Sequence, residues 1–76
     1  MSLRPQPAKK VIKVLCVLGF SAVRKRGSHV VMKHSDGRIT VIPVHAREEI
    51  SVGLLMKIIK DTGLSKEEFI KLLQEA

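Results

Sequence analysis

The chain has 76 residues, a formal net charge of +7, and a hydrophobic content of 45%. A chain of this length forms one small domain, which excludes a cofactor-binding fold joined to a separate catalytic domain. With two Phe, no Tyr and no Trp, it also lacks the aromatic side chains on which RNA-binding sheets stack bases.

Cysteine content and the N-terminal sequence indicate a reducing compartment. Cys16 is the only cysteine, so no internal disulfide can form, and we expect it to be a small core residue. It does not combine with the three histidines at zinc spacing, so no metal and no cofactor are expected. No apolar run approaches the roughly 20 residues needed to span a bilayer, and residues 1–10 contain no signal-peptide core. We therefore expect a cytoplasmic protein without membrane association.

The charge is concentrated in one part of the chain. Residues 1–47 contain ten basic side chains and one acidic one, whereas residues 48–76 contain four basic and six acidic ones. This asymmetry predicts one surface that faces a polyanion, most commonly a nucleic acid. An acidic protein partner would be attracted by the same field, and charge alone does not separate the two.

In chain order, the sequence predicts a loose leader (1–6) followed by a single domain (7–76). Apolar residues 11, 14, 15 and 18 recur at helical spacing after Pro7, and Gly19 is suited to end that helix. Residues 20–26 become basic and form the first strand. Residues 29–34 and 39–42 form the next two strands, joined by a tight turn at Ser35-Asp36-Gly37-Arg38 and ended by Pro43.

Two further helices are expected in the C-terminal part. Ser51 can cap the first of them, Gly63 ends it, and Ser65 with Glu68 forms a capping box for the last helix. The expected order α-β-β-β-α-α is an α+β fold, a three-stranded antiparallel sheet with helices packed on one face. The other face of the sheet is left free for function.

The triplet Gly27-Ser28-His29 is the strongest candidate for chemistry. It follows Arg24, Lys25 and Arg26, and an imidazole can exchange a proton near neutral pH. Beside cations that hold a phosphodiester, such a base could remove the proton from a ribose 2′-hydroxyl. The alternative is that His29 is an ordinary surface or packing residue.

The other histidines and Asp36 are less distinctive. We expect His34 to be structural or solvent-facing and Asp36 to serve the hairpin turn. Pairing around the turn should give residue sums near 73, which places His29 across from about Val44 and close to His45. Two imidazoles there could act as base and acid on a phosphate, or His45 could merely bond backbone at the strand exit.

Taken together, these motifs resemble the HicA family, the toxin components of HicA–HicB toxin–antitoxin pairs. The resemblance covers residues 8–73 and is carried by Gly19-Phe20, Gly27-Ser28-His29, the Asp-Gly turn, Pro43-Val44-His45, Gly53-Leu54-Leu55 and Gly63-Leu64-Ser65. It implies a double-stranded-RNA-binding-domain-like fold and a metal-independent, translation-blocking ribonuclease acting on mRNA. The catalytic histidine of the family corresponds to His29, and a HicB-like antitoxin is expected to cover the active site. Val30 and Val31 stand where many members carry a second histidine and an aromatic residue.

The leading hypothesis is therefore an endoribonuclease toxin that cleaves mRNA with His29 as general base. The expected RNA-binding residues are Arg24, Lys25, Arg26, Ser28, Lys33 and His45. A non-catalytic RNA-binding module of the same fold and a basic protein-interaction domain are the alternatives. Because aromatic residues are scarce, we expect loose substrate preference.

Overall fold

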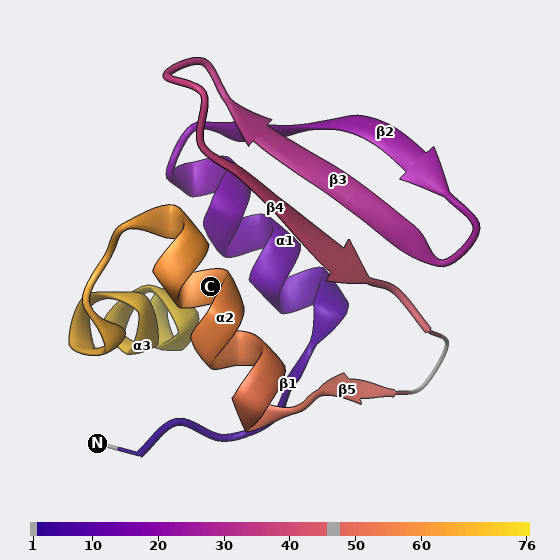
Figure 1. Ribbon diagram of the computed structural model, residues 1–76. Helices are drawn as coiled ribbons and strands as arrows, with labels where there is room; N and C mark the ends of the chain where they lie inside the picture. Colours follow the sequence, from indigo (N-terminus) through magenta and orange to yellow (C-terminus); the bar gives the residue numbers. More distant parts are fainter. Residues whose placement is uncertain (1, 46–47) are drawn as a thin grey trace.

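A computed structural model describes residues 2–45 and 48–76 of the chain. These residues form three helices, a three-stranded antiparallel sheet and a two-stranded one (Figure 1). The elements in chain order are β1 (Gln6–Pro7), α1 (Ala8–Val17), β2 (Phe20–Arg26), β3 (His29–His34), β4 (Ile39–Pro43), β5 (Glu49–Ile50), α2 (Val52–Thr62) and α3 (Lys66–Glu75).

The expected α+β layout is confirmed, with strand order β2-β3-β4 in the main sheet. Helices α1 and α2 pack directly on one face of this sheet, while α3 packs against α1 and α2 (Figure 1). The opposite face of the sheet is covered by no element among the described residues. Figure 1 also shows the tip of the β2–β3 hairpin projecting past the helices.

The helix ends follow the sequence signals. The Ser51 hydroxyl accepts the Leu54 N–H at 3.3 Å, and Gly63 ends α2 with a left-handed φ of +78°. In the capping box, the Ser65 hydroxyl accepts the Glu68 N–H at 3.1 Å and the Glu68 carboxylate accepts the Ser65 N–H at 3.2 Å. Each contact satisfies a backbone donor that helix geometry leaves without an internal partner.

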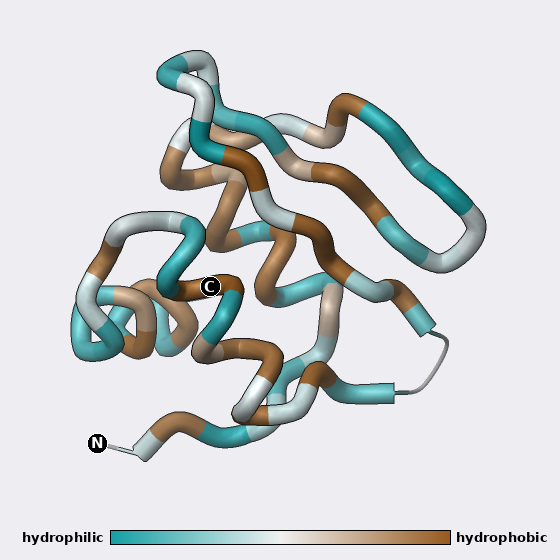
Figure 2. Tube along the Cα trace, viewed as in Figure 1, coloured by the Kyte–Doolittle hydropathy of each residue, from teal (hydrophilic) through white to brown (hydrophobic). Residues whose placement is uncertain are grey.

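One apolar core lies between the sheet and the helices, and Figure 2 shows hydrophobic stretches along the strands and helices that border it. The largest fully buried apolar side chains come from α1, β3, β4, α2 and α3: Val11, Val14, Leu15, Met32, Ile42, Leu55, Ile58 and Phe69. The expectation that Cys16 belongs to this core is wrong, because Cys16 is exposed. It follows Leu15 by about 100° around the helix, which turns it away from the buried stripe.

The β3–β4 hairpin corrects the predicted register. The residue numbers of paired residues in β3 and β4 sum to 72 rather than 73, so His29 lies opposite Pro43 and not opposite Val44. The cause is the loop, in which the His34 N–H donates to the Arg38 carbonyl at 2.8 Å and Gly37 takes a φ of +100°. The loop that contains this left-handed glycine is one residue longer than predicted, so the pairing between β3 and β4 shifts by one residue.

Residues near the N-terminus are tied to the domain at two points. Gln6 and Pro7 pair with Ile50 and Glu49, and Leu3 packs against the core. Residues 2–5 have no regular secondary structure, and Met1 lies outside the described residues. The division into a leader (1–6) and a domain (7–76) stays a prediction, although Gln6 clearly takes part in a sheet.

Candidate nucleic-acid interface

The uncovered face of the main sheet carries three rows of cross-strand neighbours. In an antiparallel sheet, residues directly opposite one another share a face, and residues two positions apart along a strand do so too. The rows that contain His29, Val31 and Lys33 are Arg26–His29–Pro43, Arg24–Val31–Val41 and Ser21–Lys33–Ile39. The register therefore places Arg24, Arg26 and Lys33 on the same face as His29.

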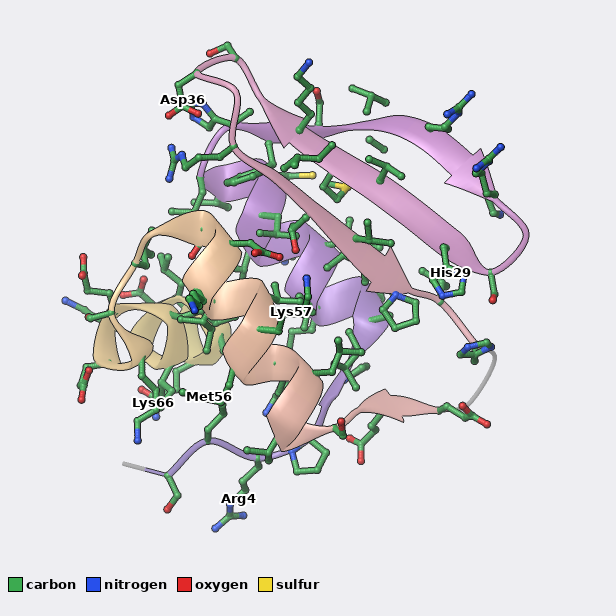
Figure 3. The ribbon with its side chains drawn as sticks, in the orientation of Figure 1. Arg4, His29, Asp36, Met56, Lys57 and Lys66 are labelled. Carbon is green, nitrogen blue, oxygen red and sulfur yellow. The ribbon has the colours of Figure 1, made fainter. Side chains whose placement is uncertain are left out.

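His29 is the first residue of β3 and is exposed. The turn that delivers it depends on Gly27, whose φ of +56° lies in the left-handed region. The Ser28 carbonyl accepts the Val44 N–H, which ties this turn to the exit of β4. Figure 3 shows His29 at the end of the sheet where β4 leaves it.

His45 lies beside His29, as the sequence suggested. The two ring centroids are 6.3 Å apart and the ring planes meet at 82°, an edge-to-face arrangement. Although the predicted register is off by one, the chain after Pro43 still places His45 at this end of the sheet. Both imidazoles are exposed, so both are accessible to a bound nucleic acid.

Lys25 is the one expected RNA-binding residue that the sheet register separates from His29. It pairs with Val30. The neighbouring residues of β3 and β4 that share a face with Val30 are buried and face the helices. A bulge at Val23 is the reason, because Ala22 lies opposite Met32 whereas Arg24 lies opposite Val31. Without that extra residue, Lys25 would lie opposite His29, and both arginines would change faces.

An apolar strip crosses the same face and was missed by the sequence analysis. Ile39 is 52% exposed and Val41 is 41% exposed, and Val31 lies between Arg24 and Val41 in the second row. The sequence did contain a signal: Ile39-Thr40-Val41-Ile42 has apolar residues at both odd and even positions. Such a strand is apolar on both faces, and only one face meets the core.

His34 and Asp36 lie at the other end of the hairpin and serve the fold. Figure 3 shows Asp36 at that end. The His34 ring packs edge-on against Phe20 at 5.3 Å between centroids. The Asp36 carboxylate accepts the Arg38 N–H at 3.1 Å and the Arg38 guanidinium at 2.9 Å. These contacts with Arg38 hold the pKa of Asp36 below its usual value. Both expectations, a structural His34 and a turn-forming Asp36, are confirmed.

Arg38 also fastens this hairpin to the helical layer. Its guanidinium lies 5.3 Å from the centroid of the Phe20 ring and donates to the Thr62 carbonyl at the end of α2. A cation at a helix C-terminus is electrostatically favourable. Arg38 thus contributes to stability at a place remote from His29.

Residues 2–45 and 48–76 contain no group of three or more His, Cys, Asp or Glu placed to hold a metal ion. In the same part of the chain, no helix is both long and apolar enough to cross a membrane.

A small α+β domain with one open sheet face, lined by cations and an exposed histidine, is typical of proteins that bind a polyanion. A family model described as the HicA toxin of bacterial toxin–antitoxin systems matches residues 8–64, from the start of α1 to just past α2. No curated protein is similar enough in sequence to count as a relative. The chain belongs to the HicA toxin family and is the toxin component of a toxin–antitoxin pair.

Proposed function

We propose that this toxin is an endoribonuclease that cleaves mRNA with His29 as its general base. The observation that carries the proposal is the position of His29, exposed on the open sheet face and directly paired with Arg26. A general base must be accessible to the substrate hydroxyl, and cations must lie where the phosphate binds. The family match supports the toxin role itself.

In the proposed reaction, His29 removes the proton from a ribose 2′-hydroxyl, and the resulting oxygen attacks the adjacent phosphorus. The P–O5′ bond breaks, and the 5′-oxygen leaves and takes up a proton, which gives a 2′,3′-cyclic phosphate and a 5′-hydroxyl. Arg24, Arg26 and Lys33 hold the RNA backbone and stabilise the negative charge that develops on the phosphoryl oxygens. The Ser28 hydroxyl, next to His29, is a further contact to the phosphate or ribose. No metal is required in this scheme, because the 2′-oxygen is itself the nucleophile.

We further propose that a HicB-like antitoxin inhibits by covering this same face. The apolar strip of Val31, Ile39 and Val41, bordered by arginines and Lys33, suits a protein partner with an apolar centre and acidic rim. RNA needs the cations and a protein also needs the apolar strip, so the two partners compete for one surface.

The ribonuclease proposal is tested by incubating the purified protein with a mixed RNA pool, with and without excess EDTA. We expect cleavage in both, with 2′,3′-cyclic phosphate or 3′-phosphate ends and 5′-hydroxyl ends. Ends mapped as 5′-phosphate and 3′-hydroxyl would contradict the proposed mechanism. His29→Ala should reduce the rate by about 10²–10⁴-fold while the circular dichroism spectrum stays unchanged.

Two outcomes would favour the alternative functions. RNA binding without cleavage would indicate a non-catalytic RNA-binding module, and neither binding nor cleavage would indicate a domain that contacts proteins only. His29→Ala protein that cleaves within about threefold of the wild-type rate would remove His29 as the base.

Occlusion is tested with charge reversal. Arg24→Glu combined with Arg26→Glu should weaken the binding of both RNA and antitoxin, whereas Lys66→Glu combined with Lys71→Glu on α3 should weaken neither. A ternary complex of toxin, antitoxin and uncleaved RNA at stoichiometric concentrations would contradict competition for one face.

A further inference from the structure

Two imidazole rings meet at the end of the main sheet, and the ribonuclease scheme above uses only one of them. The His29 and His45 ring centroids are 6.3 Å apart and the rings are nearly perpendicular. Both rings are exposed, and a centroid separation of this size is typical of neighbouring rings. A phosphate bound against this end of the sheet can therefore contact both imidazoles.

The backbone holds His45 from both sides. The Val44 N–H, one residue before it, donates to the Ser28 carbonyl next to His29. On the other side, the His45 carbonyl accepts the Glu48 N–H at 3.2 Å. The first bond joins the two histidine-bearing segments directly, so it helps to fix the backbone of His45 relative to that of His29.

The charges differ on the two sides of this pair. His29 pairs with Arg26 on the same face of the sheet, and a guanidinium there attracts a phosphate. His45 instead lines a hollow of about 300 Å³ together with Glu48 and Glu49. Carboxylates repel a phosphate and tolerate a positively charged imidazolium. This asymmetry assigns the phosphate-binding side to His29 and the proton-donating side to His45.

We propose that His45 is the general acid of the reaction, an assignment that rests on the proposed ribonuclease function. His29 takes the proton of the 2′-hydroxyl as the O2′–P bond forms. The P–O5′ bond breaks, and protonated His45 gives its proton to the leaving 5′-oxygen. The products are a 2′,3′-cyclic phosphate and a 5′-hydroxyl, with His29 now protonated and His45 neutral. Exchange of protons with water restores both histidines.

The proposal is tested with two RNA oligonucleotides that share a sequence cleaved by the wild-type protein. One is unmodified, and in the other a sulfur replaces the bridging 5′-oxygen at the cleaved bond. A thiolate leaves without protonation, so this substrate needs no general acid. We expect His45→Ala to be about 10²–10⁴-fold slower than wild type on unmodified RNA. On the sulfur substrate it should approach the wild-type rate, whereas His29→Ala should be slow on both.

The controls separate a catalytic role from a structural one. His45 is exposed, so its replacement should leave the melting temperature nearly unchanged. His45→Gln keeps a polar side chain of similar size and should behave like His45→Ala. Val17→Ala removes an exposed apolar side chain of α1, away from both histidines, and should cleave unmodified RNA at the wild-type rate.

Two results overturn the assignment without touching the ribonuclease proposal. One is His45→Ala that cleaves unmodified RNA at the wild-type rate. The other is His45→Ala that is equally slow on both substrates, which would give His45 a binding role only. Wild-type protein that cleaves neither substrate would instead overturn the ribonuclease function and this assignment with it.

Discussion

The sheet register makes a sharp prediction about three consecutive cations. Arg24 and Arg26 share the face of His29, whereas Lys25 lies on the other side. Each side chain that neutralises a phosphate of single-stranded RNA contributes about 0.7 to the slope of log K against log salt concentration. Replacing both arginines with alanine should therefore reduce the slope by about 1.4. Lys25→Ala should leave it almost unchanged.

The assay is fluorescence anisotropy of a labelled single-stranded RNA, measured over a series of salt concentrations. Every variant is made in the His29→Ala background, so that the RNA stays intact during the titration. Lys71→Ala on α3 serves as a matched control, because it removes the same charge at a distance from the sheet. If Lys25→Ala reduced the slope of log K against log salt concentration as much as Arg26→Ala does, the placement of the RNA on the open face would be refuted.

Three further predictions concern stability, each measured by chemical or thermal denaturation. Gly19→Ala should destabilise the protein by about 1–2 kcal/mol or more, because φ is +99° and the added Cβ would lie 2.8 Å from the His34 Nε2 atom. Ser65→Ala should cost about 1 kcal/mol, since it removes the N-cap of α3; an unchanged melting temperature would contradict this. In the Asp36→Asn variant, the free energy of unfolding should change less with pH in the acid range. The folded-state pKa of Asp36 is lowered from 3.8 by its contacts with Arg38. The stabilisation that these contacts supply is therefore present above pH 3.8 and disappears as the pH falls through the lowered pKa. A gap between wild type and Asp36→Asn that does not shrink as the pH falls further and further below 3.8 would show that the carboxylate charge is not its cause.

Much of the fold was predictable because its signals are local. A helix with an apolar stripe, a serine cap and a left-handed glycine stop can be recognised from a few neighbouring residues, as in α2 between Ser51 and Gly63. The triplet that ends in His29 could be recognised for the same reason, since a turn followed by a strand requires only adjacent residues. The position of Cys16 was mispredicted, because it depends on which side of α1 the core occupies.

The sequence by itself determined the class of the protein, the helices with their caps and the basic N-terminal half, and it singled out one histidine as the candidate for chemistry. Only the tertiary structure decided which side chains share a face with that histidine. One bulge residue, Val23, reverses the faces of Arg24, Lys25 and Arg26, because side chains alternate along a strand and one extra residue inverts the alternation. One left-handed glycine in the β3–β4 loop likewise moved Pro43 opposite His29. The contact between His29 and His45 joins segments that meet only when the sheet is formed, and their spacing follows from hydrogen bonds between strands that local patterns do not encode.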